Sequence, residues 1–417
     1  MIVLHGLVLL GLMIYFFKRT ADDKLLFWSA WILRLIMGIL VGLVYTYYYD
    51  ANDTWNFFED AKTLAALARA DLPGYLSFLF TGNPDHAIWQ SLIYQEERSL
   101  FFVKALSLLA WISGGSYWIC SLYFSTISFA AAWILFRTVI RYFEKAKPAA
   151  ALSFLFFPSV VFWSSGLVKE TLALAGIFWM SAFFLRWLKG DRITLIQFLI
   201  TFAALWFAWK LKYYWTALFV AVVLTSVLTS LIQRRKEGLK SYWGIVWVIL
   251  LVTGCAVASQ VHPNFYFSRF LEVIVNNHDE FAQISKPGVL IHFYNLQPDW
   301  WSMVLNSPWA LISGLFRPWL GEANSLTGLL AAIENLLLLT LAVSACFRKS
   351  WKTGHTLLLT TVITYMVLLC VLMALSTPNL GTLSRYRVGF LPFFVFVISY
   401  GNPLLAKIRL SAWHRHT

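Results

Sequence analysis

Hydrophobic residues along this chain fall in long blocks that are separated by short polar stretches. Each block has about the 20 residues that a helix needs to cross a hydrocarbon core of about 30 Å. The blocks are apolar on every face, whereas strands of a membrane barrel alternate apolar and polar positions. The pattern therefore predicts an all-α integral membrane protein, a polytopic bundle of about eleven transmembrane helices. The predicted spans are 2–17, 25–48, 117–136, 149–163, 171–187, 193–209, 214–233, 242–260, 326–346, 355–376 and 388–404.

Basic residues gather in every second connection between these spans, which predicts that those connections are cytoplasmic and that the N-terminus lies outside. Residues 50–116 and 261–325 then form two outer loops within a single membrane domain, 1–417. The short apolar stretches 99–113 and 302–316 are predicted to be interfacial or re-entrant helices of these loops. A full span at 99–113 would move the next basic cluster outside. The clusters are Lys18, Arg19 and Lys24; Arg137, Arg141, Lys145 and Lys147; Arg186, Lys189 and Arg192; Arg234, Arg235, Lys236 and Lys240; Arg348, Lys349 and Lys352; and Lys407, Arg409 and Arg415.

Composition supports the membrane prediction and argues against nucleic acid as a partner. Hydrophobic residues are 59% of the 417 positions and charged residues 13%, about half the share usual in a soluble domain. The net charge of +13 comes from short clusters between apolar blocks, as membrane topology requires, and not from one basic surface. The four cysteines lie in or beside apolar segments and have no metal-ligand spacing, so a disulfide framework is not expected.

Several charges lie at predicted outer turns, where topology does not explain them. An ionisable group costs about 2.5–3.5 kcal/mol at the centre of a membrane helix and less near the surface. Salt bridges could offset that cost if the cations Lys169, Arg317, Arg385 and Arg387 pair with Glu170, Glu322, Asp50 or Asp53. Alternatively, basic turns that converge on one face would bind an anionic ligand such as the phosphate of a lipid carrier. The residues are Lys169, Glu170, Lys210, Lys212, Arg317, Glu322, Arg385 and Arg387.

Two aspartates, Asp50 and Asp53, begin the first outer loop. A carboxylate that is partly desolvated at the membrane surface can have a raised pKa and act as a general base toward an acceptor hydroxyl. With Asn52, these aspartates could instead hold a divalent cation such as Mg²⁺ or Mn²⁺. The alternative interpretation is a solvated aspartate that caps a helix.

Three segments resemble the polyprenyl-phosphate-sugar-dependent membrane glycosyltransferases of the GT-C fold, close to the bacterial dolichyl-phosphate-mannose protein mannosyltransferase-like group. One is the acidic start of the outer loop, Tyr49-Asp50-Ala51-Asn52-Asp53-Thr54. Another is the turn at 158–170, which ends in Ser164-Ser165-Gly166-Leu167-Val168-Lys169-Glu170. The third is Arg385-Tyr386-Arg387 followed by Leu391-Pro392-Phe393.

The resemblance implies a bacterial inner-membrane enzyme that moves a hexose or pentose from a polyprenyl-phosphate carrier to a glycan, lipid or protein acceptor. It implies that Asp50 or Asp53 is the catalytic base and that the outer lysines and arginines bind the carrier phosphate. The first loop departs from the family pattern because it has no Asp-Glu pair. Three other functions stay open: a polysaccharide polymerase or O-antigen-type ligase that relies on arginines, a transporter or flippase of a lipid-linked anion, and a non-catalytic scaffold.

Overall fold

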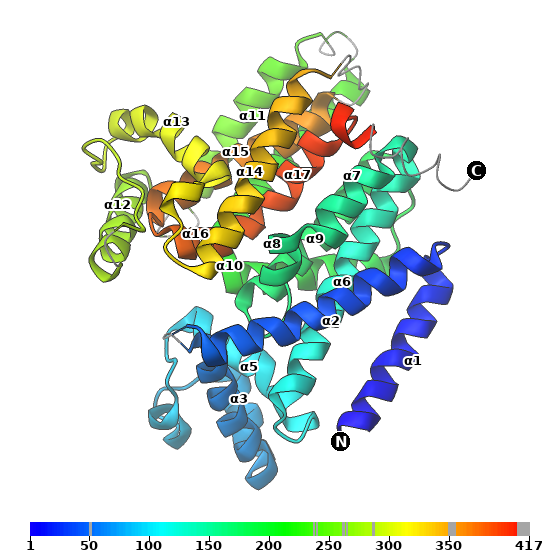
Figure 1. Cartoon of the computed structure of the whole chain (residues 1–417), viewed down its shortest axis with the longest axis vertical. Helices are drawn as coiled ribbons and strands as arrows, with labels where there is room; N and C mark the ends of the chain where they lie inside the picture. The colour runs from blue at the N-terminus through cyan, green and yellow to red at the C-terminus, as the bar shows by residue number, and fades with distance from the viewer. Residues whose placement is uncertain are drawn as a thin grey trace. The chain divides into compact units, whose positions relative to one another are not determined.

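A computed structural model describes residues 1–49, 52–236, 238, 241–260, 263, 266–285, 288–348 and 356–406. In this part of the chain, every regular element is a helix (Figure 1). Seven of these helices are long and apolar enough to cross a membrane, and a bent pair of helices could add an eighth. The chain is therefore a multi-pass α-helical membrane protein. Outside the described residues lie Asp50, Lys240, Lys349, Lys352, Lys407, Arg409 and Arg415.

Six of the eleven predicted spans coincide with single long helices. They are α1 (Ile2–Thr20), α2 (Lys24–Tyr47), α6 (Tyr117–Tyr142), α9 (Lys169–Leu188), α14 (Leu326–Cys346) and α15 (Thr356–Ser376). Two further predicted spans, 193–209 and 214–233, are the halves of α10 (Leu195–Arg235). The backbone of Lys212 is non-helical, with φ −143° and ψ 69°, so α10 breaks where the sequence predicts a turn.

The remaining three predicted spans, the fourth, the eighth and the eleventh, are shorter or interrupted, so eleven full-length spans are not confirmed. The predicted span 149–163 consists of α7 (Lys147–Ala151), a π-helical turn (Leu152–Phe156) and α8 (Pro158–Trp163). Proline has no backbone N–H and disfavours a helical residue before it, which accounts for the break at Phe157. The eighth predicted span, 242–260, is α11 (Trp243–Ala258), and the eleventh, 388–404, contains α17 (Leu391–Ser399). Before α17 lie α16 (Leu380–Tyr386) and the 3₁₀ turn Arg387–Gly389, and this preceding segment is bent by 70° against α17.

Both predicted outer loops contain helices. The stretch 99–113 falls in α5 (Glu97–Ile112) and 302–316 in α13 (Trp300–Phe316). Neither of them is among the helices that are long and apolar enough to span a membrane. The other helices of the loops are α3 (Asp53–Ala70), α4 (Leu72–Thr81), the 3₁₀ turn Ala87–Ser91, α12 (Phe267–Ile284) and the 3₁₀ turn Leu320–Glu322.

The chain divides into two compact units. Unit 1 comprises residues 1–142, 154–185 and 193–214, and unit 2 comprises 143–153, 186–192 and 215–417. Because each unit collects several segments, no single point in the sequence separates them. In unit 2, α17 packs against both α14 and α15.

In unit 1, α2 and α6 pack side by side in opposite directions. Phe27 near the start of α2 meets Trp133 near the end of α6, with ring centroids 4.9 Å apart. Gly42 near the end of α2 lies against Trp118 at the start of α6, where a Cβ at Gly42 would come within 2.8 Å of the indole. The chain therefore leaves α2 and enters α6 at the same end of this helix pair, so α5 between them does not act as a single full crossing.

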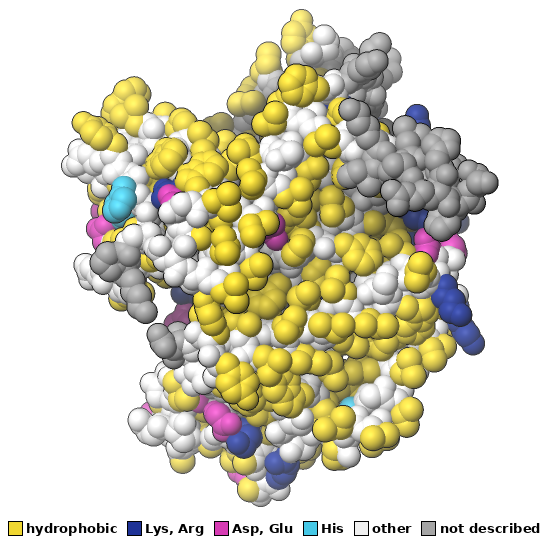
Figure 2. Space-filling view, viewed as in Figure 1, with side chains coloured by type: hydrophobic (Ala, Val, Ile, Leu, Met, Phe, Trp, Pro, Cys, Tyr) yellow, Lys and Arg dark blue, Asp and Glu magenta, His cyan; other side chains and the backbone are white. Residues whose placement is uncertain are grey.

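The helices expose many hydrophobic side chains on their surfaces. Figure 2 shows hydrophobic side chains covering much of the visible surface of the helices. Ile2 and Val3 of α1 and Leu330 of α14 are each at least 60% exposed. Large exposed apolar surfaces of this kind mark membrane or protein contact, and the spanning helices explain them as lipid contact.

Candidate functional site

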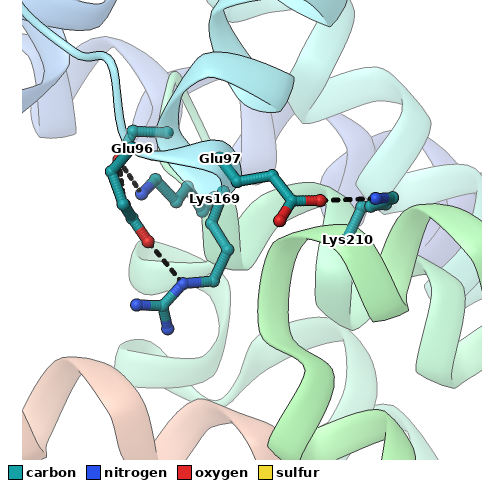
Figure 3. A network of polar contacts seen from close by, with 6 residues as sticks. Glu96, Glu97, Lys169 and Lys210 are labelled. Carbon is teal, nitrogen blue, oxygen red and sulfur yellow. Dashed lines mark hydrogen bonds and ion pairs between the residues drawn. The ribbon is translucent and has the colours of Figure 1, made fainter. Parts of the chain in front are cut away.

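Unit 1 brings together charged residues from three distant segments: the start of α5, the start of α9 and the break in α10 (Figure 3). The Lys210 ammonium lies 2.6 Å from a carboxylate oxygen of Glu97. The Lys169 ammonium donates to the Ser99 hydroxyl at 2.8 Å. Lys169 and Lys210, predicted as phosphate ligands, therefore do belong to one cluster.

Lys169 is held by a hydroxyl and an aromatic ring. Its nitrogen lies 4.9 Å from the centre of the Phe57 ring, in addition to the contact with Ser99. In the described part of the chain, no carboxylate oxygen lies within 4.0 Å of this nitrogen. The Ser99 hydroxyl in turn donates to the Glu96 carboxylate at 2.7 Å. Within the described residues, Lys169 is thus linked to the Glu96 carboxylate through the Ser99 hydroxyl.

Glu96 also holds Arg98, whose Nε lies 2.6 Å from the Glu96 carboxylate. The Arg98 guanidinium lies over the Tyr213 ring, 5.7 Å from its centre. Burial alone would raise the pKa of Glu96, but the Ser99 hydrogen bond and the charges of Arg98 and Lys169 outweigh it, so the pKa lies below its ordinary value. Glu96 is therefore an ionised carboxylate between two cations at neutral pH.

Lys212 and Glu170 form a buried ion pair. Their side chains are 6% and 0% exposed, and the ammonium lies 2.7 Å from the carboxylate. Lys212 is the residue at which α10 breaks, and Glu170 lies in the first turn of α9. This pair fastens α9 to the break. Glu170 therefore pairs with Lys212, a partner that the sequence did not predict for it.

Asp53 lies beside the same cluster. Its carboxylate interacts with the Tyr94 phenol, which also contacts the Asn56 side chain. Burial and the Asp53 charge raise the pKa of Tyr94. The Tyr94 ring stacks on Phe57 at 4.3 Å between centroids, and Phe57 in turn contacts Lys169. Contacts through Tyr94 and Phe57 thus connect the predicted base to the predicted phosphate ligand.

Asp60 is a structural carboxylate that the sequence does not reveal. Its side chain is 1% exposed and accepts the backbone N–H groups of Ile93 at 2.9 Å and Tyr94 at 2.8 Å. Asp60 therefore anchors on α3 the segment that carries Tyr94.

We expect Asp60→Asn to destabilise the protein by about 1–3 kcal/mol, because an amide NH₂ would face a buried N–H donor. The matched control is Glu59→Gln, since Glu59 forms only an exposed pair with Lys62 and should change stability by less than about 1 kcal/mol. Thermal unfolding in detergent, followed by tryptophan fluorescence, measures both. Equal stability of the two variants would contradict the anchoring role.

In unit 2, the predicted arginines Arg317 and Arg387 have carboxylate partners. Arg317 forms a two-pronged ion pair with Glu322, which also accepts the Trp319 N–H at 2.8 Å. Arg387 is buried and donates to the Glu334 carboxylate at 2.8 Å and to the side-chain oxygen Oδ1 of Asn335. The Asn335 amide donates to Pro318 O at 3.0 Å, so Arg387 lies close to the Arg317 segment. Glu334 and Asn335 were detectable as a polar pair inside an apolar block.

Arg385 is half-buried in α16, and Asp50 lies outside the described residues. The predicted site residues therefore form one cluster in unit 1, which contains Asp53, Lys169, Glu170, Lys210 and Lys212, and one group in unit 2. Among the described residues, no three histidine, cysteine, aspartate or glutamate side chains gather as a metal site. No protein-family model, curated protein or solved structure matches this chain.

Proposed function

We propose that this protein is a GT-C-type membrane glycosyltransferase that moves a sugar from a polyprenyl-phosphate carrier to an acceptor hydroxyl. One observation carries the proposal: Lys169 is a largely buried cation held by a hydroxyl and a ring, with Arg98 beside it and Asp53 nearby. Cations that lack a tight carboxylate partner suit an incoming phosphate.

Lys169 and Arg98 are the proposed phosphate ligands. Glu96 lies between them and is half-exposed just before α5 begins. A carrier phosphate, which offers more acceptor oxygens than a carboxylate, competes with Glu96 for both cations. Arg98 pairs with Glu96, and the other predicted cations also pair with carboxylates, so Lys169 is the principal proposed ligand and the paired cations have supporting roles. These other cations are Lys210, Lys212, Arg317 and Arg387.

Asp53 is the proposed general base. Its carboxylate takes the proton of the acceptor hydroxyl, whose oxygen attacks the anomeric carbon. The bond from that carbon to the carrier phosphate oxygen breaks, and the phosphate leaves with the bonding electrons. Lys169 and Arg98 stabilise the charge that develops on the phosphate. The contact with Tyr94 orients Asp53 for this step.

The proposal includes the orientation of the site. Asp22, before α2, forms an ion pair with Arg137 near the end of α6 at 2.7 Å. These residues belong to the predicted cytoplasmic connections, and Asp53 follows the other end of α2. The positive-inside rule then supports an extracytoplasmic site. We propose the bacterial inner membrane as the location and cell-envelope polysaccharide or glycoconjugate as the product.

Replacement of Asp53 tests the reaction. We expect Asp53→Asn to lower transfer roughly 10²–10⁴-fold, the usual contribution of a general base, while donor binding stays unchanged. Transfer of radiolabelled sugar from a panel of polyprenyl-phosphate hexoses and pentoses is measured in membranes that contain the protein. Glu59→Gln, six residues further along α3, serves as the matched control.

The double variant Asp50→Ala/Asp53→Ala separates the two enzyme classes. Retained transfer would overturn the aspartate base and favour an arginine-dependent polymerase or ligase. Failure of every polyprenyl-phosphate sugar to bind would overturn the donor class itself.

A transporter of a lipid-linked anion is the second candidate, because discontinuous helices often form transport sites. The interruptions at Phe157, Lys212 and Phe390 favour it. Proteoliposomes distinguish the two functions. A transporter moves labelled donor across the bilayer without consuming it, whereas the proposed transferase cleaves the donor when acceptor is present.

A further inference from the structure

Arg34 is a fully buried arginine in the middle of α2. Its Nη1 donates to the hydroxyls of Ser128 and Ser164 and, at 3.2 Å, to the Ser164 carbonyl. Its Nη2 donates to the Phe154 carbonyl at 3.0 Å. Among the residues that the structure describes, none of its partners is a carboxylate. A cation in a membrane span is costly, so this arrangement needs a reason.

The carbonyls that Arg34 binds lie at two helix ends. In a continuous helix, the N–H of residue 158 would bond to the carbonyl of residue 154, but Pro158 has no N–H. Arg34 supplies the missing donor to Phe154. Ser164 follows the last residue of α8, where helix carbonyls also lack partners. The partial negative charge of these helix ends offsets the guanidinium charge.

The turn after Ser164 is fixed from both neighbouring helices. Gly166 has φ +72°, and its N–H donates to the Ser125 hydroxyl of α6 at 3.0 Å. A Cβ at Gly166 would lie 3.1 Å from the Gly38 carbonyl of α2. The Thr171 hydroxyl donates to the Gly166 carbonyl at 3.0 Å and links the turn to α9, which begins at Lys169. Only four residues separate Ser164 from Lys169.

We infer that Arg34 is a positioning residue: by holding both sides of the break at 154–164, it sets where Lys169 enters the polar cluster. This claim concerns the geometry of Lys169 and holds whatever ligand the cluster binds. A further consequence, weaker binding of the carrier phosphate when Arg34 is replaced, rests on the proposed function.

Thiol labelling tests the position of residue 169 directly. Cys120, Cys255, Cys346 and Cys370 are replaced by serine or alanine, and Lys169→Cys or Glu97→Cys is introduced into the full chain. Each is combined with Arg34, Arg34→Lys or Arg34→Met. The rate of modification by a charged, water-soluble methanethiosulfonate reports the environment of the thiol. Glu97 lies in the same cluster but not on the segment that Arg34 holds.

We expect Arg34→Lys to change the labelling rate at residue 169 by about tenfold or more, the factor that corresponds to the loss of one charged hydrogen bond. At residue 97 we expect less than about a twofold change, since Arg34 and Glu97 have no common partner among their hydrogen bonds and ion pairs, and sites without shared partners couple weakly. An unchanged rate at residue 169 overturns the inference. Equal changes at both positions also overturn it, because they indicate general loosening.

Two serine variants give the answer even if the Arg34 variants do not fold. Ser164→Ala removes a contact between Arg34 and the turn, and Ser128→Ala removes a contact with α6 only. Ser164→Ala is expected to shift labelling at residue 169, and Ser128→Ala is the matched control. Equal effects of the two overturn the inference. If labelling changes as expected but the protein binds no polyprenyl-phosphate sugar, the positioning role of Arg34 is supported and the proposed function is refuted.

Discussion

Lys169→Gln is expected to lower sugar transfer by roughly 10²–10³-fold, the usual loss when one preorganised electrostatic group is removed from a transition state. Glutamine keeps a donor for Ser99 but removes the positive charge. Because Lys169 forms no ion pair within the described residues, the loss of its charge leaves no buried carboxylate without an ion-pair partner. Activity should therefore fall while thermal unfolding in detergent changes little.

Lys210→Gln is the matched control for this variant. Lys210 lies in the same cluster, but its side chain is 36% exposed and its partner Glu97 is 79% exposed. Exposed ion pairs contribute about 0–1 kcal/mol to stability, because water screens the charges. We therefore expect Lys210 to contribute less than Lys169 to donor binding. Donor binding and transfer are measured for both variants with the same labelled polyprenyl-phosphate sugar. Equal losses would show that the cluster acts only through its overall charge, and would refute a specific role for Lys169.

The spans were largely predictable because the bilayer imposes length and apolar composition on each helix without reference to its neighbours. The predicted span 326–346 matches α14 at both ends. The interruptions were harder to predict. Pro158 signals a break, but the sequence does not reveal the π-helical turn before it or the hydrogen bond that Phe154 in this turn accepts from Arg34 of another helix.

The candidate site was partly predictable from charges that topology does not explain. Lys169 and Asp53 were found in that way, and they lie in one cluster. Asp60 was missed, because its burial depends on Ile93 and Tyr94, which fold back from more than thirty residues later in the chain. Arg34 was missed, although it is the one charge inside the predicted span 25–48.

Pairing among the charges could not be predicted, because it depends on packing between distant segments. Glu170 lies next to Lys169 in the sequence, yet its ion pair is with Lys212 at the break in α10. Arg387 pairs with Glu334, which is more than fifty residues away and was not considered a site residue. Sequence identifies which charges are unusual, whereas only the fold decides which of them neutralise one another.

Lys212→Met is expected to destabilise the protein by about 3–5 kcal/mol, because it leaves the buried Glu170 carboxylate without its lysine counter-charge. Methionine fills most of the volume of the lysine stem, so the loss is electrostatic and not a cavity effect. Thermal unfolding and the fraction of monodisperse protein after gel filtration measure the change. An unfolding temperature equal to that of Lys169→Gln would contradict the buried ion pair.

The double variant Lys212→Met/Glu170→Gln separates the charge effect from the role of the break. Once both charges are absent, no uncompensated ion remains, and buried pairs can be replaced at small net cost. Stability should recover to within about 1–2 kcal/mol of the parent, since an amide at residue 170 still needs hydrogen-bond partners. A double variant as unstable as Lys212→Met would mean that the lysine acts through the break in α10 itself. Recovered stability together with retained transfer would assign Lys212 to the scaffold and leave Lys169 as the lysine that acts on the donor.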